Sequence, residues 1–210
     1  LQNSGVEVHS IGVYSINTDP NKIRAAITGI WNVKAARELQ RLLMTLDRNS
    51  TVVHIHGYVH YLSVSIINTC KKMGFHTVLT MHDYFTACPC GGFYDYGEKN
   101  ICKRKPMSLQ CVFCNCDKRS YLQKIWRMAR QLFINRLVRF NCELNLIYIS
   151  EFSYSKLKPW LKAQNTYFVR NPYDLGDESV YEAEYNHDYL YVGRLSEEKG
   201  VEIFCEALST

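Results

Sequence analysis

The chain alternates short β-like runs with helical apolar patterns along most of its length, and this alternation constrains the fold more than any other feature. Nearly continuous apolar runs are typical of strands buried in a parallel sheet, whereas apolar residues at every third or fourth position are typical of amphipathic helices. The runs predict strands at residues 6–13, 51–56, 77–81, 144–149 and 166–171. They therefore predict an α/β protein with a mostly parallel, doubly wound sheet and right-handed crossovers.

Helical patterns separate these runs. We expect helices at residues 22–46, 59–73 and 119–140 and a short one after Ser150. Gly74 is predicted to follow the second helix as its left-handed C′ residue, and Pro159 to end or kink the helix after Ser150. The two longest helices carry apolar stripes that we expect to face inward: Ile30, Val33, Ala36, Leu39, Leu43 and Leu46 in the first, and Leu122, Ile125, Ala129, Leu132, Leu137 and Phe140 in the last.

Residues 172–188 interrupt the alternation, because they are polar, acidic and aperiodic. We interpret them as a linker between an N-terminal domain at 1–171 and the start of a second α/β domain at 189–210. The second part opens with the stretch YLYVGRLSEEKG at 189–200. It reads as a buried strand at 189–192, a break at Gly193 and a helix start capped by Ser196.

The charges in this stretch suggest an anion. Glu197 and Glu198 suit the positive end of a helix dipole, but Lys199 costs a few tenths of a kcal/mol there, roughly, unless an anion lies beside it. Arg194 and Lys199 can clamp an oxyanion between them with the help of free backbone N–H groups. The alternative interpretation is a surface turn with solvated charges.

Histidines occupy the ends of two predicted strands. His54 and His56 alternate with Ile55 and so share one face, and we favour a structural role for both. His82 and Asp83 follow the strand at 77–81 and precede a long loop. Ligands of open parallel sheets bind at the carboxyl ends of the strands, so His82 is the stronger candidate for a functional residue.

Five motifs stand in an order that resembles one enzyme family. They are VVHIHG at 52–57, VLTMHDY at 78–84, LIYISEFSYSKL at 146–157, FVRNP at 168–172 and YLYVGRLSEEKG at 189–200. Together they resemble the family 4, or group 1, glycosyltransferases, which transfer sugars from nucleotide-sugar donors. Bacterial polysaccharide-biosynthesis members are especially similar, because in them MHDY precedes a cysteine-bearing loop and a helix start like CDKRSYLQKIWR at 116–127.

The resemblance implies the GT-B fold, in which two Rossmann-like domains face each other across a cleft. It implies that Gly193, Arg194 and Lys199 bind the donor diphosphate, that His82, with Asp83 beside it, reaches the transferred sugar, and that Asn171 lies where the first domain leads into the cleft. The family retains the anomeric configuration. It requires no metal cofactor, since cationic side chains and helix N-termini supply the countercharge.

The implied reaction is hexosyl or N-acetylhexosaminyl transfer from a nucleotide-diphosphate sugar to a glycan or polyprenyl-linked acceptor in polysaccharide biosynthesis. A nucleotide-sugar epimerase on the same fold is an alternative. The family's first glycine-rich turn and its paired glutamates fall outside these residues, so we interpret the chain as an internal fragment that is inactive alone. Without a membrane-length apolar run or a signal-peptide pattern, we expect a cytoplasmic protein, located at the inner face of the plasma membrane if the acceptor is lipid-linked.

Six of the nine cysteines fall in one loop: Cys88, Cys90, Cys102, Cys111, Cys114 and Cys116. A C-x-x-C pair is a good zinc half-site, but Cys88 and Cys90 are too closely spaced for a usual knuckle. We favour reduced thiols packed in the loop over a structural zinc ion, and disulfides are the least favoured.

The net charge of +5 conceals a local basic block. Residues 99–139 hold eleven Lys and Arg but only one acidic residue, Asp117. On the helix these bases accompany Tyr121, Trp126 and Phe133, which suits an anionic membrane surface, although one solvated helix face is the simpler interpretation. A zinc-knuckle module that binds nucleic acid is a further alternative, but it leaves the strand and helix alternation unexplained, so we do not expect a nucleic-acid partner.

Overall fold

The computed structural model describes residues 18–162, 165–172 and 188–208. The expected strand at 6–13 and nearly all of the expected linker at 172–188 lie outside the described residues. The chain divides into two compact units, Leu1–Arg170 and Asn171–Thr210.

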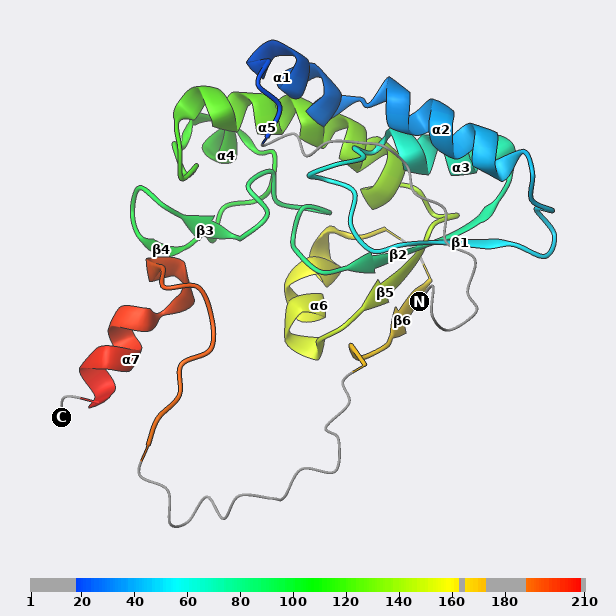
Figure 1. Ribbon diagram of the computed structural model, residues 1–210. Coiled ribbons are helices and arrows are strands. Elements are labelled where there is room, and N and C mark those ends of the chain that lie inside the picture. The colour runs from blue at the N-terminus through cyan, green and yellow to red at the C-terminus, as the bar shows by residue number, and fades with distance from the viewer. Residues whose placement is uncertain (1–17, 163–164, 173–187, 209–210) are drawn as a thin grey trace. The chain divides into compact units, whose positions relative to one another are not determined.

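Four strands of the first unit form a parallel sheet in the order β1-β2-β5-β6 (Figure 1). Neighbouring strands are in parallel register, with Val78 of β2 opposite His54 on one side and Asn145 on the other. This confirms the predicted α/β class and parallel sheet. The order of the described strands follows the chain without the reversal that defines a doubly wound sheet. The strands are β1 Val52–Ile55, β2 His76–Met81, β5 Asn145–Tyr148 and β6 Thr166–Phe168.

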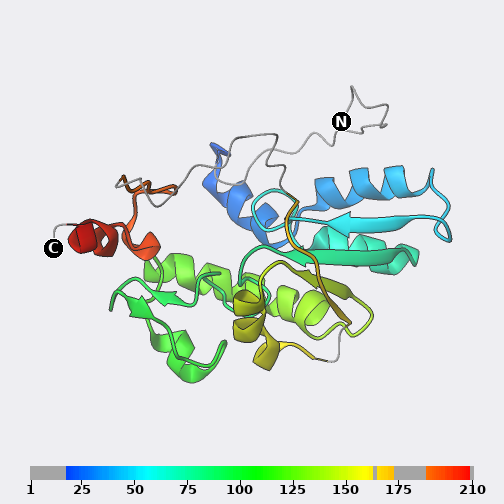
Figure 2. The same cartoon turned by 90° about the horizontal axis from the view of Figure 1, so that it is seen from below.

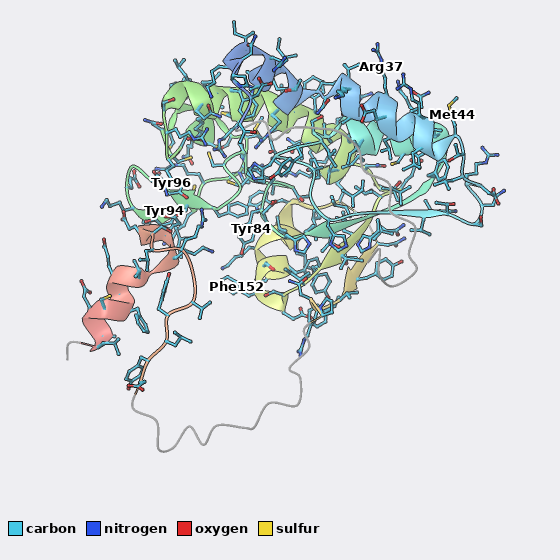
Figure 3. The ribbon with its side chains drawn as sticks, viewed as in Figure 1. Arg37, Met44, Tyr84, Tyr94, Tyr96 and Phe152 are labelled. Carbon is cyan, nitrogen blue, oxygen red and sulfur yellow. The ribbon has the colours of Figure 1, made fainter. Side chains whose placement is uncertain are left out.

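The helices at 22–30, 33–43, 65–73 and 121–134 lie in one layer on one side of this sheet, whereas the helix at 151–157 lies apart from that layer (Figure 1). Met44 and Arg37 project from the outer side of the layer (Figure 3). The helices of the first unit are α1 Lys22–Ile30, α2 Val33–Leu43, α3 Ser65–Met73, α4 Leu109–Phe113, α5 Tyr121–Ile134 and α6 Glu151–Leu157. Among the most buried core side chains are Val64, Ile67, Leu79, Ile134, Val138, Leu146 and Leu157.

The prediction that β1 is covered on both faces is wrong. Val52 is 61% exposed, and the only fully buried residue of the strand is Ile55. The reason is position, because β1 stands at the end of the row of described strands and pairs only with β2 there.

The single helix predicted at 22–46 is instead two helices. Asn32 has an extended backbone, and its Oδ1 accepts a hydrogen bond at 3.0 Å from the backbone N–H of Ala35, which makes it the N-cap of α2. Its Nδ2 also donates to the carbonyl of Tyr61 at 3.0 Å. The Asn32 side chain pairs a backbone N–H of the first turn of α2, and this favours the start of a new helix after Asn32. The buried residues of α2 are Ala35 and Leu43.

The helix predicted at 59–73 begins only at Ser65. Ser63 stands in the left-handed region with φ of 58°, which interrupts a right-handed helix. Its hydroxyl oxygen accepts a hydrogen bond at 2.8 Å from the N–H of Asn32, while the Ser65 hydroxyl donates to the carbonyl of Asn32 at 2.9 Å. These bonds tie the start of α3 to the start of α2. Gly74 follows α3 with φ of 73°, as predicted.

The inward stripe predicted for the helix at 119–140 is wrong. Leu122 and Leu132 are 81% and 61% exposed, whereas Lys124 and Gln131 are fully buried. The helix also ends its regular part at Ile134 and continues as one π-helical turn, Asn135–Arg139. Its inner face packs on the cysteine-rich loop, where carbonyls and thiols give buried polar side chains partners.

The cysteine-rich loop contains a small antiparallel hairpin of β3 Tyr94–Asp95 and β4 Asn100–Ile101, followed by α4. Figure 2 shows the hairpin and α4 beside the N-terminal part of α5 and away from the strands of the parallel sheet. Tyr94 and Tyr96 point from the hairpin in neighbouring directions (Figure 3), with their ring centroids 5.0 Å apart.

In the second unit the described residues form a short 3-10 turn, Glu197–Lys199, and the helix α7 Val201–Leu208. The strand predicted at 189–192 is not formed, and Leu190 and Val192 are exposed. An isolated strand leaves its backbone groups without hydrogen bonds, and the described part of this unit offers no second strand. Ser196 is the N-cap residue of the 3-10 turn, as predicted for a helix start, but its side chain makes no capping hydrogen bond and the regular helix begins only at Val201.

Candidate functional site

The carboxyl ends of β1 and β2 bring His54, His56 and His82 together, and we call these three residues the histidine cluster. His56 Nδ1 lies 3.2 Å from His82 Nε2, and their rings stack with centroids 5.5 Å apart. The rings of His54 and His56 are 4.1 Å apart, which confirms that they share one face of the strand. Because β1 and β2 are parallel neighbours, residues at their carboxyl ends necessarily meet at one edge.

The inner end of the cluster is fixed by Thr80. His54 Nε2 lies 2.8 Å from Thr80 Oγ1 of the neighbouring strand. Desolvation, with smaller contributions from His56 and His82, lowers the pKa of His54. His54 is thus a hydrogen-bonded residue whose lowered pKa favours the neutral form, and it is exposed like His56 and His82. The structural role predicted for His54 and His56 stays a prediction, and the contact of His56 with His82 makes His56 a further candidate for a functional residue.

Asp83 follows His82 and turns the chain away from β2. Its Oδ1 accepts a hydrogen bond at 3.0 Å from the backbone N–H of Phe85. Desolvation by the surrounding protein atoms raises the pKa of Asp83, although part of the residue contacts solvent. The hydrogen bond from Phe85 opposes this rise, and so do the smaller effects of the charges of His60, Arg130 and His82. A carboxylate in such surroundings is suited to hold or accept a proton.

The hollow next to His82 is small. A cavity of about 20 Å³ lies between the residues that follow β1 and the end of β2, with His56, His82, Asp83 and Thr86 among its lining residues. Such a volume is close to that of one water molecule. Among the described residues, the histidine cluster therefore forms an exposed polar surface beside a hollow that is too small for a sugar.

The predicted diphosphate residues lie in the second unit on a turn held by one tyrosine. The hydroxyl of Tyr191 donates to the carbonyl of Arg194 at 3.1 Å and lies 3.4 Å from the carbonyl of Lys199. Arg194 is exposed and its guanidinium reaches Glu198 at 3.9 Å. Lys199 ends the 3-10 turn and is followed by Gly200 with φ of 73°. Tyr191 thus links the backbone at Arg194 with the backbone at Lys199, but Lys199 does not stand in the first turn of a regular helix as the sequence suggested.

The remaining predicted site residues are Gly193 and Asn171, and both are exposed. Gly193 precedes Arg194 within the same turn. Asn171 opens the second unit. The histidine cluster belongs to the first unit, so its placement opposite Arg194 and Lys199 stays a prediction.

All nine cysteines are free thiols. Within residues 18–162, 165–172 and 188–208, no group of three or more His, Cys, Asp or Glu side chains is arranged to hold a metal ion. Two thiols of the loop, Cys90 and Cys116, lie 3.9 Å apart, and the buried Lys124 donates to Cys116 Sγ at 3.1 Å. The hydrogen bond from Cys90, followed by that from Lys124, lowers the pKa of Cys116 to about 6. The loop is therefore organised around a lysine and a thiolate.

The basic block does not form one solvated helix face. Lys124 is buried among cysteines, and Arg127 makes an ion pair with the buried Asp117, with 2.8 Å between Nε and Oδ2. Arg130 is also buried, and its guanidinium lies 4.8 Å from the ring centre of Phe85. These charges are not on an open surface that a nucleic-acid backbone or a flat bilayer can reach. The exposed bases of the block lie at two places, in the cysteine-rich loop and at the ends of α5: Lys99, Lys103 and Lys105 in the loop, and Lys118, Arg119 and Arg136 beside the helix.

The sequence did not predict the contact of His56 with His82 or the burial of Lys124 and Arg130. A signal for His56 was available, because parallel strands in sequence order bring their ends together. The burial of Lys124 and Arg130 had no such signal, since it depends on how the cysteine-rich loop folds over α5.

Comparisons of the chain with family models, with curated proteins and with solved structures give no match. Among the helices that the structure describes, none combines the length and the apolar character that crossing a bilayer requires.

Proposed function

We propose that these residues belong to a retaining glycosyltransferase that moves a sugar from a nucleotide-diphosphate sugar to a glycan or lipid-linked acceptor. The observation that carries the proposal is the exposed pair of His56 and His82, joined at 3.2 Å, at the carboxyl edge of a parallel sheet with Asp83 beside it. This edge is where ligands of open α/β sheets bind. Imidazole and carboxylate groups in that position suit hydrogen bonds to sugar hydroxyls.

In the proposed reaction the acceptor hydroxyl oxygen forms a bond to the anomeric carbon on the face that the diphosphate leaves. The bond between the anomeric carbon and the diphosphate oxygen breaks, and its electron pair stays on the diphosphate. The proton of the acceptor hydroxyl passes to that leaving oxygen. His82 binds and orients the sugar, while Arg194 and Lys199 compensate the charge that develops on the diphosphate.

The turn of the second unit supports this division of roles. Tyr191 fixes the backbone at Arg194 and Lys199, so two cations are presented from a short segment. Cationic side chains can stabilise a leaving diphosphate without a metal ion, and the proposed reaction therefore needs no cofactor. Arg194 can exchange its partner Glu198 for a phosphate oxygen, because the ion pair is long at 3.9 Å and the Arg194 side chain is exposed.

The test is transfer of a labelled sugar by the polypeptide expressed from its natural reading frame, with a panel of nucleotide-diphosphate sugars and a lipid extract as acceptor. We expect His82→Ala mainly to lower kcat and Lys199→Ala mainly to raise KM for the donor, because the first residue is assigned to the reaction centre and the second to the diphosphate. Loss of one cation at a phosphate weakens binding by about tenfold or more.

Two substitutions serve as matched controls. His76 is an exposed histidine at the opposite end of β2, and Lys72 is an exposed lysine of α3. His76→Ala and Lys72→Ala should leave both constants unchanged. Unchanged kinetics in His82→Ala and Lys199→Ala would remove the site assignment, and epimerised donor without transfer would favour the epimerase.

Attachment to an anionic membrane surface belongs to the same proposal, as does a cytoplasmic location at the inner face of the plasma membrane. Exposed apolar side chains on α1 and α5, Ile23, Ile27 and Leu122, stand near the bases Lys22 and Arg119. This combination suits the interface of an anionic bilayer. Co-sedimentation with anionic vesicles tests it, and equal binding to neutral vesicles would count against electrostatic attachment.

A further inference from the structure

A second, much larger cavity lies between α1, α5 and the segment after β1. Its volume is about 400 Å³, within the range of small-molecule pockets. The indole Nε1–H of Trp126 on α5 donates to the carbonyl of Ala26 on α1 at 2.8 Å and holds the two helices together at this point. Figure 1 shows α1 lying against α5. The cavity is thus part of the packing of two helices.

The side chains that line this cavity carry an excess of positive charge. Its charged lining residues are Lys22, Arg119, Arg127 and Arg130, and among the described residues no acidic side chain lines it. Arg127 is paired with Asp117, so Lys22, Arg119 and Arg130 carry the uncompensated charge. His60 also lines it, and desolvation, followed by the charge of Arg130, lowers the pKa of His60. The positive charge at neutral pH therefore comes from the lysine and the arginines.

Arg130 is the residue that most needs a ligand. It is only 5% exposed, and its Nε has no hydrogen-bond partner among the residues that the structure describes. Its guanidinium lies between the rings of Phe85 and Trp126, at 4.8 and 5.1 Å from their centres, and one of its nitrogens lies 3.4 Å from the Pro89 carbonyl. Burying a guanidinium with unsatisfied donors is costly, and an anion in the cavity would compensate for it.

We infer that this cavity binds a phosphoryl group, a phosphate monoester or diphosphate, through Arg119 and Arg130. Arginine is suited to phosphate because its donors match two oxygens at once. The N-terminus of α5, capped by Ser120, adds a positive dipole end to the same wall. Leu122, which lines the rim and is exposed, offers apolar surface for a chain attached to the phosphate.

The phosphoryl site stands on the first unit and does not involve Arg194 or Lys199. Val59 lines both this cavity and the one beside His82, and Arg130 acts electrostatically on Asp83. Assigning the bound phosphate to the acceptor substrate rests on the proposed function. The phosphoryl site itself does not, because it follows from the charge and burial of the cavity.

Titration of the 210-residue chain with inorganic pyrophosphate and with farnesyl diphosphate, followed by calorimetry, tests the inference. We expect both probes to bind and Arg119→Gln to weaken binding by about tenfold or more, since each lost charged hydrogen bond has that effect. Arg130→Gln should weaken it similarly. Arg119 is exposed, so its replacement keeps the test valid if the Arg130 variant does not fold. The matched control is Arg136→Gln, an exposed arginine outside the cavity.

The two probes separate the sources of the phosphate. Tighter binding of farnesyl diphosphate supports a lipid-linked phosphate, and equal binding supports a soluble phosphorylated ligand. No binding of either probe at millimolar concentration overturns the inference, and so does an equal loss in Arg136→Gln. Pyrophosphate binding that Arg119→Gln weakens, in a polypeptide that uses no nucleotide sugar, would keep this site and remove the proposed transferase.

Discussion

Replacing Lys124 with methionine tests whether a buried ammonium organises the cysteine-rich loop. The lysine side chain is fully buried, and its Nζ donates to the carbonyl of Cys114 at 2.6 Å and to Cys116 Sγ at 3.1 Å. Desolvation acts to lower the pKa of Lys124, but the hydrogen bond with Cys116 and the neighbouring thiols leave that pKa raised. The ammonium therefore stays charged at neutral pH and holds residues 114–116 against α5.

Methionine fills a similar volume but donates no hydrogen bond, so both bonds are lost. Hydrogen bonds from a charged donor contribute about 1.5–3 kcal/mol each, and a buried carbonyl left without a partner costs about 1–3 kcal/mol. Removing the buried charge relieves its desolvation and offsets part of this loss. We expect a net loss of about 2–3 kcal/mol in the free energy of unfolding, which for a chain of this length lowers Tm by about 4–12 °C.

The assay is urea unfolding at pH 8 under reducing conditions, followed by circular dichroism. Lys105→Met is the matched control, because Lys105 is an exposed lysine of the same loop and its replacement should change stability by less than about 0.5 kcal/mol. If Lys124→Met is as stable as Lys105→Met, the lysine does not stabilise the loop through these bonds and the reasoning is wrong.

Two further predictions concern the same loop. Gly91→Ala should destabilise the protein by about 2 kcal/mol or more, because φ is 76° there and an added Cβ would lie 2.5 Å from the ring of Phe85. Gly57→Ala is the control and should destabilise the protein less, because nothing lies within 4 Å of its added Cβ. Thermal unfolding of the two variants measures the difference. The pKa of Cys116, lowered to about 6 mainly by its hydrogen bond with Cys90, should appear as thiolate absorbance at 240 nm that rises near pH 6 and is missing in Cys116→Ser. Because the pKa of Cys116 in the folded protein is below the unfolded value of 9.0, the thiolate stabilises the folded state fully above pH 9, and this stabilisation is lost as the pH falls through about 6. An absorbance that rises only near pH 9 would contradict the assignment.

The sheet could be predicted because strand formation is marked locally in this sequence. The runs around Val53, Leu79 and Leu146 are apolar, bounded by turn residues and separated by helical patterns, and each forms a strand of the parallel sheet. The His82–Asp83 dipeptide was placed correctly at a strand end for the same reason. The predictions of which side chains are buried failed where burial depends on a segment from elsewhere in the chain.

The helix α5 is the main example of that failure. Its apolar residues predicted one inner face, but the cysteine-rich loop covers a different face and supplies partners for Lys124 and Gln131. The same holds for Leu190 in the second unit, where an apolar run without a neighbouring strand forms no strand. Periodicity records which side chains are apolar, but burial is decided by what packs against them.

The sequence by itself determined the class of fold, the order of the strands along the chain and the positions of His82 and Asp83 at a strand end, because these depend on interactions between residues close in the chain. Only the tertiary structure decided which residues meet. It joined His56 to His82 across two strands, buried Lys124 beside Cys116, and left Arg130 inside a cationic cavity. The physical reason is that desolvation and hydrogen bonding depend on distances between atoms that the chain brings together only when it folds.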